Sequence, residues 1–318
     1  MNFKFNNVYL NDVALLVGPK EGNTKFAKYF DLIYKDFYMN TKSFDDALSK
    51  MIYDSIDILL TKSKLKPKDI DIVLSSDLSN QVAASSYAVK NISIPYIGVY
   101  AACASSTLEL ILASSLIQSR KIKNAICTVA SHSKQSEKQF RYPVEYGAPK
   151  RKTTTVTATA SASILISNVK SNIKITSATI GEVKNGGIKD VYNMGGVMSI
   201  SAFSTIEKHL KYTKTKLTDY DLILTGDLGR YGVNILKELL KKDINIMDAG
   251  SILDKNFAGA SGPVCLPLIA FGPVLEKMKS KEYKKVLLVA TGSLHNTTYC
   301  NEKKEIPSIS HVISLEAV

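Results

Sequence analysis

Two stretches of this chain, 150 residues apart, have similar sequences, in which a short apolar strand is followed by a polar loop. Asp69–Gln81 (DIDIVLSSDLSNQ) matches Asp219–Tyr231 (DYDLILTGDLGRY), which places Asp77 opposite Asp227. Further on, Asn124–Ser133 (NAICTVASHS) matches Lys285–Leu294 (KVLLVATGSL) in the same pattern. A repeat this long indicates a duplicated domain and not a solenoid of short units.

Each copy alternates buried strands with helices, which predicts an α/β fold of parallel strands covered by helices. We therefore expect two similar halves, residues 1–170 and 171–318. A dinucleotide-binding domain is not expected, because no GxGxxG motif follows a predicted strand.

The composition is that of an ordinary globular protein, with 45% apolar and 22% charged residues. Four cysteines stand far apart without a CxxC pair, which argues against a disulfide framework or a zinc site and favours a reducing compartment. Asn and Asp interrupt the apolar residues of the first segment, so we expect no signal peptide. No apolar run reaches the ~20 residues that span a bilayer, so we expect a cytoplasmic protein.

The formal net charge of +12 has two interpretations. The lysines are spread through short clusters next to acids or at segment ends, as on solvated helix faces. Alternatively, a basic surface contacts an anionic membrane or an acidic partner. Nucleic-acid binding is not expected, because the clusters lack interleaved aromatic residues and no DNA- or RNA-binding module is recognisable.

The stretch Tyr96–Leu116 (YIGVYAACASSTLELILASSL) predicts a strand, a tight turn of small residues and a buried helix, with Cys103 at the elbow. Three residues that favour helix N-caps follow, namely Ser105, Ser106 and Thr107. The helix dipole and free amides there favour a thiolate nucleophile. The same donors would hold a bound carboxylate. A third interpretation is a small buried structural cysteine.

A duplicated α/β chain with this elbow cysteine resembles the thiolase superfamily, in particular ketoacyl synthase III-like chains. Further motifs resemble the stage V sporulation protein AD (SpoVAD) family within it, namely YAACASS around Cys103, QFRYPVEYG at Gln139–Gly147, FAGASG at Phe257–Gly262 and EIPSISH at Glu305–His311. The resemblance implies a thiolase-like fold. Two pseudo-duplicated βαβαβαββ halves would form an αβαβα layered sandwich, with the cysteine at the start of a central helix.

The resemblance also implies a function. SpoVAD-like proteins are expected to bind dipicolinic acid (pyridine-2,6-dicarboxylate) without catalysis and to support its uptake into the developing spore with other SpoVA membrane proteins. A homodimer is expected, and a peripheral position on the inner face of the spore membrane is a further hypothesis. No cofactor is implied, although calcium is a conceivable companion of the ligand, with Asp77 as an oxygen donor. The predicted ligand-binding residues are Asp77, Leu78, Cys103, His132, Arg141 and Tyr146.

The alternative is a ketoacyl synthase III-like acyltransferase that uses Cys103 as its nucleophile, with His132 or His295 as base. Condensing enzymes of this type place a histidine, with an asparagine or second histidine, in the second half. The matching positions here read Gly226-Asp227-Leu228-Gly229 and Phe257–Ser261 (FAGAS), and they lack these residues. An enzyme is therefore not expected, since an aspartate disfavours a neighbouring thiolate.

The chain departs from the SpoVAD pattern at three positions. Pro263 stands where a second-half cysteine is expected, Ala158 where a turn glycine is expected, and Asn193 where an acidic residue is expected. These departures affect the predicted pocket more than the predicted fold.

Overall fold

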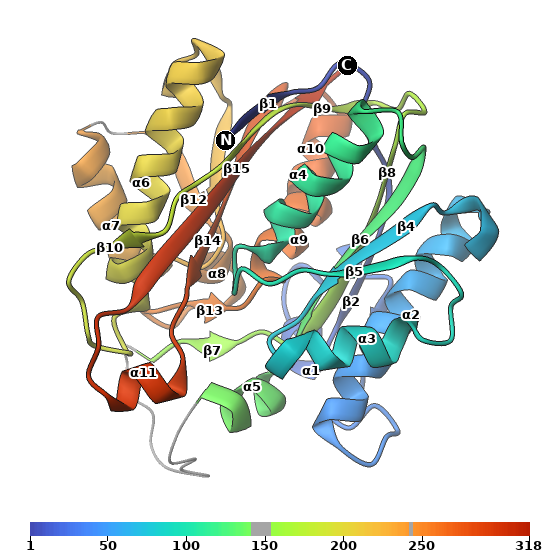
Figure 1. Cartoon of the computed structure of the whole chain (residues 1–318), viewed down its shortest axis with the longest axis horizontal. Coiled ribbons are helices and arrows are strands. Elements are labelled where there is room, and N and C mark those ends of the chain that lie inside the picture. The colour runs from blue at the N-terminus through green and yellow to red at the C-terminus, as the bar shows by residue number, and fades with distance from the viewer. Residues whose placement is uncertain (141–153, 242–243) are drawn as a thin grey trace.

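The computed structural model in Figure 1 describes residues 1–140, 154–241 and 244–318. Arg141 and Tyr146, two of the predicted ligand-binding residues, lie outside the described residues. The described strands are β1 (Asn2–Lys4), β2 (Tyr9–Val17), β3 (Leu32–Ile33), β4 (Ile72–Ser76), β5 (Tyr96–Gly98), β6 (Asn124–Ser131), β7 (Val156–Thr157), β8 (Ala160–Ser167), β9 (Ile173–Ile180), β10 (Lys184–Asn185), β11 (Leu222–Thr225), β12 (Ile246–Asp248), β13 (Ala260–Ser261), β14 (Lys285–Ser293) and β15 (Pro307–Ala317).

The described helices alternate with these strands along the chain. They are α1 (Pro19–Gly22), α2 (Phe44–Ser63), α3 (Ala83–Val89), α4 (Ser105–Gln118), α5 (Ser133–Phe140), α6 (Met194–Thr213), α7 (Gly229–Leu240), α8 (Ala249–Leu253), α9 (Cys265–Ile269), α10 (Leu275–Lys279) and α11 (Thr297–Asn301), with a π-helical segment η5 (Ala270–Val274) between α9 and α10. Short 3-10 turns are η1 (Ala27–Tyr29), η2 (Pro67–Asp69), η3 (Asn80–Val82) and η4 (Leu217–Asp219).

The strand order shows the duplication directly. Ten of the strands follow one hydrogen-bonded path, β12-β11-β14-β15-β9-β2-β8-β6-β4-β5; β1, β3 and β10 pair with strands of this path, and β7 and β13 form a separate pair. From the centre outward, β2-β8-β6-β4-β5 and β9-β15-β14-β11-β12 have the same sequence of pairings: two antiparallel, then two parallel. The predicted α/β fold with two pseudo-duplicated halves is confirmed.

The helices form layers on both sides of the strands (Figure 1). On the outer side of the first half, α2 contacts β2, β6 and β8, and α6 contacts β9, β14 and β15 in the corresponding place of the second half. Between the halves, α4 contacts strands of both. Its side chains are buried on nearly every side, as expected for a helix without a polar face. The α9–η5–α10 segment is the second central helix, and it is also largely buried.

The outer helices have the sequence signals of amphipathic surface helices. Ser43 caps α2 by accepting a hydrogen bond from the amide of Asp46, and Lys64 ends the helix in the left-handed conformation.

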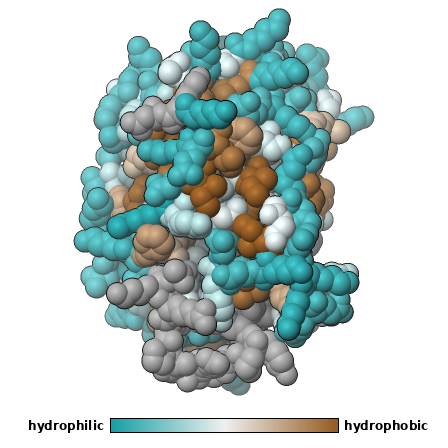
Figure 2. Space-filling model, turned by 90° about the vertical axis from the view of Figure 1, so that its left-hand side faces the viewer, coloured by the Kyte–Doolittle hydropathy of each residue, from teal (hydrophilic) through white to brown (hydrophobic). Residues whose placement is uncertain are grey.

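Figure 2 shows the left-hand face of Figure 1, where apolar side chains gather among hydrophilic ones on the side that carries α6 and α7. Among the described residues, none of the helices has the length and apolar content needed to cross a membrane.

Candidate functional site

Cys103 lies in a tight elbow between β5 and α4, as predicted. Ala102, directly before it, has a φ of 48°, in the left-handed region that non-glycine residues seldom adopt. The Ser105 hydroxyl fixes the turn, because it accepts a hydrogen bond from the Ala101 amide and donates one to the Ala102 carbonyl, both at 2.8 Å. Only 8% of Cys103 is exposed, so the elbow presents a buried thiol.

The prediction that a hydroxyl side chain caps α4 is wrong. Ala104 is the N-cap residue, and no side chain caps the first turn. The amides of Ala104 and Ser105 donate instead to the carbonyls of Ala101 and Ala102. These bonds use two of the donors that the helix start was expected to offer an anion.

Strands β14 and β15 of the second half pack against the elbow and the start of α4. A Cβ on Gly292 of β14 would lie 2.5 Å from the carbonyl oxygen of Ala101, so the close approach requires glycine there. Thr107 of α4 donates to the carbonyl of His311 in β15 at 3.3 Å. The site is therefore built jointly by both halves.

Asp227 lies two residues after the end of β11, and its side chain approaches Cys103 from the second half of the chain. The two side chains lie close enough that Asp227 raises the pKa of the thiol and the thiol lowers the pKa of Asp227. The Asp227 carboxylate also accepts hydrogen bonds from the Gly262 amide at 3.1 Å and from the Thr291 hydroxyl at 3.3 Å. Only 1% of Asp227 is exposed, so the carboxylate is shielded from water.

Burial decides the protonation of both groups. It raises the pKa of Asp227 to about 7, with a smaller contribution from nearby Asp248, while the Cys103 thiol and the hydrogen bonds from Gly262 and Thr291 lower it. Burial, followed by the negative field of Asp227, raises the pKa of the Cys103 thiol well above its usual value. The proton therefore stays on sulfur at neutral pH. The elbow holds a neutral thiol beside a carboxyl group that titrates near neutrality.

Asp77, the counterpart of Asp227 in the repeat, organises the loop after β4. Its carboxylate accepts hydrogen bonds from the amides of Ser79 and Ser85 at 2.6 and 2.8 Å, and from the hydroxyls of the same two serines. Only 1% of Asp77 is exposed, and Leu78 beside it is also buried. These contacts give Asp77 a structural role at the start of α3, and its part in ligand binding stays a prediction.

Tyr100 is a residue that the sequence reasoning missed. It precedes the small residues of the elbow, and 49% of it is exposed. Burial of the remainder raises the pKa of its hydroxyl, and the fields of Cys103 and Asp77 raise it further. Tyr100 thus lies near both predicted residues and is partly exposed to solvent. Its position directly before Ala101-Ala102-Cys103 is the only signal in the sequence.

His132 lies apart from this group. Its Nε2 bonds the Phe37 carbonyl at 2.9 Å, and its ring stacks on Phe44 with centroids 5.3 Å apart. Burial lowers its pKa, so the ring is neutral at pH 7. Its ring contacts Phe37 before α2 and Phe44 at the start of α2, and its Nδ1 accepts from the Gln135 amide at 3.4 Å; none of these contacts involves Cys103. The prediction that His132 serves the ligand stays untested, but its surroundings are those of a structural histidine.

The remaining three histidines belong to the second half of the chain. His209 of α6 bonds Thr179 and Ser314 within the protein, and burial lowers its pKa to about 4. His311 in β15 is similarly buried. His295 follows β14 and shares a 3.3 Å contact with the Ser293 hydroxyl. These contacts of the described residues are with partners other than Cys103.

The three departures from the SpoVAD pattern fit the fold. Asn193 caps α6 by accepting from the Gly196 amide at 3.2 Å. Ala158 is buried, and its backbone does not adopt the left-handed conformation that favours glycine. Its amide donates a hydrogen bond to the Ser261 carbonyl at 2.9 Å, so the fold does not need glycine there. Pro263 lies in the turn that leads into α9.

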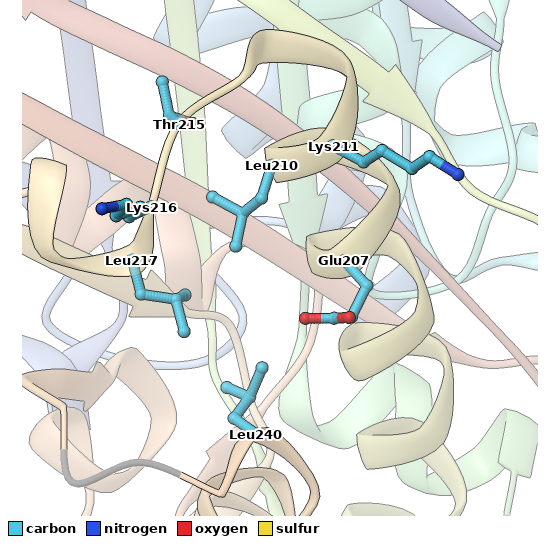
Figure 3. A pocket seen from close by; sticks show the side chains of 7 residues that line it. All are labelled: Glu207, Leu210, Lys211, Thr215, Lys216, Leu217 and Leu240. Carbon is cyan, nitrogen blue, oxygen red and sulfur yellow. The ribbon is translucent and has the colours of Figure 1, made fainter.

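The described residues contain no cluster of three or more His, Cys, Asp or Glu side chains that would hold a metal ion. A surface pocket of ≈ 290 Å³ opens between α6 and α7, far along the chain from the elbow residues. Figure 3 shows its floor of Leu210, Leu217 and Leu240, with the Glu207 carboxylate turned into it and Lys211 turned away. A carboxylate facing the space makes it a poor seat for an anion.

Comparisons with known proteins agree on family and fold. The profile of the family described as Stage V sporulation protein AD (SpoVAD) matches residues 1–316. The chain is 35% identical to "Stage V sporulation protein AD" of Bacillus subtilis (strain 168) over 318 positions, which cover 97% of this chain and 94% of that protein.

Two solved structures represent the fold. The 3-oxoacyl-[acyl-carrier-protein] synthase III of Aquifex aeolicus VF5 matches with a TM-score of 0.59 at 15% identity and covers 98% of this chain and 97% of its own. A variant of Xanthomonas campestris OleA bound with cerulenin matches with a TM-score of 0.62 at 14% identity, over 99% of this chain and 98% of its own. At such identities these structures show the fold alone.

Proposed function

The chain belongs to the stage V sporulation protein AD (SpoVAD) family of sporulation proteins, with a thiolase-like fold, and we propose that it binds dipicolinic acid at the Cys103 elbow without catalysing a reaction. The observation that carries the non-catalytic part is the pairing of Cys103 with Asp227. A nucleophilic cysteine needs a lowered pKa or a base that takes its proton. Here burial and the negative field of Asp227 raise the pKa of the thiol well above its usual value, so the proton stays on sulfur at neutral pH.

Two groups at the elbow support the binding of a flat aromatic dicarboxylate, namely Tyr100 and Asp227. The half-exposed ring of Tyr100 provides a face for stacking against a pyridine ring. Asp227 repels a carboxylate when it is ionised, and it becomes a hydrogen-bond donor when it is protonated. Because its pKa is about 7, the protonated form is accessible at neutral pH. Ligand binding would therefore take up a proton at Asp227.

The setting of this binding is also part of the proposal. The protein would work with other SpoVA membrane proteins, as a homodimer at the inner face of the spore membrane. Calcium would enter with the ligand, because the carboxylate of Asp77 already accepts hydrogen bonds from Ser79 and Ser85.

The second candidate is an acyltransferase that uses Cys103. One observation favours it, namely that the solved neighbours of this fold include a 3-oxoacyl-[acyl-carrier-protein] synthase III. The two functions differ in covalent chemistry. An acyltransferase forms an acyl thioester at Cys103, and a binding protein does not.

Calorimetric titration of dipicolinate tests the proposal, with and without Ca²⁺. We expect saturable binding to the wild type, at least about tenfold weaker binding to Tyr100→Ala because stacking is lost, and unchanged binding to His132→Ala if that variant keeps its fold. Tyr231→Ala is the matched control, since Tyr231 is similarly exposed, at 48%, on α7. Saturable binding that Tyr100→Ala leaves intact would move the ligand away from the elbow.

Absence of binding in every condition would refute the proposal. Intact-mass analysis after incubation with acyl-CoA then separates the two candidates. A mass increase that Cys103→Ala abolishes would establish the acyltransferase, and an unchanged mass is expected for the binding protein.

A further inference from the structure

The topology brings five lysine-rich segments to one edge of the molecule. The paired starts of β4 and β6, and those of β11 and β14, lie side by side. The start of β9 joins them through the end of β15. The segments that lead into these five strands therefore lie together at the amino ends of the parallel strands. We call this surface the basic edge; its segments are 62–71, 119–124, 168–174, 211–221 and 277–285.

The basic edge carries most of the net charge of the chain. Its segments hold 17 lysine and arginine residues and five acidic ones. Three further acids reach it by pairing with its lysines, namely Asp12 and Asp31 with Lys62, and Glu316 with Lys285. The excess at this edge is then nine positive charges out of a total of +12. This is a concentration of charge, not the even spread of a solvated surface.

Four of the five acids of the basic edge accept hydrogen bonds from main-chain amides, and the fifth, Glu282, pairs with Lys277 at 2.7 Å. Asp69 and Asp219 accept from the backbone amides of Lys66 and Lys216, and Asp71 and Asp221 accept from amides at the starts of β6 and β14. Their carboxylates are therefore held by main-chain groups. Most of the lysine side chains here are exposed, and Figure 2 shows hydrophilic side chains along the upper edge, where α6 ends.

The composition of the basic edge favours a lipid surface over a nucleic acid. Sixteen of the 17 basic residues are lysines, which act as point charges, whereas specific phosphate recognition favours the fork of arginine. Apolar side chains stand among them, with Val169 61% exposed and Leu65 and Ile122 half-buried. Lysines around exposed apolar residues fit the interface of an anionic bilayer.

We propose that the basic edge docks the protein directly on an anionic lipid bilayer. Anionic headgroups attract lysines within a Debye length of the surface, and many such lysines add up to stable binding. The elbow would face away from the lipid, because Cys103 precedes the 14 residues of α4 and the helix ends at this edge, about 20 Å away. The proposal is independent of what the elbow binds.

Co-sedimentation with vesicles of phosphatidylcholine, alone or mixed with phosphatidylglycerol, tests this inference on the full chain. The edge variant combines Lys68→Glu, Lys121→Glu, Lys170→Glu and Lys279→Glu. The control variant combines Lys35→Glu, Lys42→Glu, Lys189→Glu and Lys255→Glu, four exposed lysines outside the basic edge. Both variants have the same net charge, so a difference in their binding reports where the charges lie and not how many there are.

We expect the wild type to bind only the vesicles that contain phosphatidylglycerol, and added salt to weaken this binding. The edge variant should lose about tenfold or more in partition onto these vesicles, and the control variant less than about threefold. Equal losses in the two variants, salt-independent binding, or no binding by the wild type would overturn the proposal. Should the edge variant fail to melt like the wild type, the lipid and salt dependence of the wild type still decides. Titration with dipicolinate should be the same for both variants, which keeps this test separate from that of the elbow.

Discussion

Cys103 of the first half and Asp227 of the second half lie beside each other at the elbow, close enough that each side chain shifts the pKa of the other. The pair differs from the arrangement of a cysteine nucleophile, because the thiol keeps its proton at neutral pH. The same pair makes the site sensitive to pH, since Asp227 titrates at about 7.

The first prediction concerns the reactivity of Cys103. In the native protein at pH 7 we expect iodoacetamide to alkylate Cys103 at least about tenfold more slowly than in the denatured chain, because burial and Asp227 suppress its thiolate. Peptide mass mapping over time measures the rate. Cys300, only partly buried on α11, is the internal control and should react before Cys103. Faster modification of Cys103 than of Cys300 would instead support the acyltransferase, in which Cys103 is the nucleophile.

The second prediction concerns Asp227→Asn. The amide cannot ionise, so the variant should bind dipicolinate at pH 8 about tenfold more tightly than the wild type and with little pH dependence. In the wild type, affinity should fall as the pH rises through the pKa of about 7, because the ionised carboxylate repels the ligand. Calorimetry at pH 6 and 8, in buffers with different ionisation enthalpies, measures affinity and proton uptake together. Wild-type affinity that does not change between these pH values would contradict a role for Asp227.

The sequence was sufficient to predict the fold, because the repeat fixes which strands correspond. The match of Asp69–Gln81 to Asp219–Tyr231 places Asp77 and Asp227 after equivalent strands, and the structure confirms this placement. Sequence order also located the elbow, since a strand, small residues and a helix leave few other conformations for Cys103.

The contents of the site were harder to predict. His132 follows the strand next to the elbow, but its side chain turns toward Phe37 and Phe44, and strand order carries no information on that direction. Tyr100 was missed because a tyrosine at a strand end usually packs on a core. The prediction of a hydroxyl cap on α4 failed because Ser105 uses its hydroxyl inside the turn.

The third prediction concerns Asp77→Ala. The change removes the acceptor of the hydrogen bonds from Ser79 and Ser85 and leaves buried donors unpaired, so the free energy of unfolding should fall by about 3 kcal/mol. Urea denaturation measures this loss. Asp45→Ala, an exposed change at the start of α2, is the comparison and should cost less than about 1 kcal/mol. Equal costs for the two variants would show that the Asp77 network does not stabilise the loop.

The last prediction concerns Glu109, a fully buried residue of α4. In the described part of the chain, neither carboxylate oxygen has a hydrogen-bond partner of good geometry, although the Ser76 hydroxyl and the Thr128 backbone face the group. Burial raises the pKa of Glu109 well above its ordinary value of 4.5. The folded protein therefore keeps a proton that the unfolded chain releases above pH 4.5. Its contribution to stability is complete below that pH and is lost progressively as the pH rises.

Glu109→Gln keeps the shape of the side chain but cannot ionise, so it should abolish this loss. At pH 7.5 we expect the free energy of unfolding to increase by about 1 kcal/mol or more relative to the wild type, and the difference to shrink toward pH 4.5. Urea denaturation across this pH range measures the slope. Glu238→Gln, on the exposed side of α7, should leave the slope unchanged. If Glu109→Gln destabilises the protein at pH 7.5, the carboxyl group is ionised and paired in the folded state, and its burial between α4 and the first-half strands would need a different explanation.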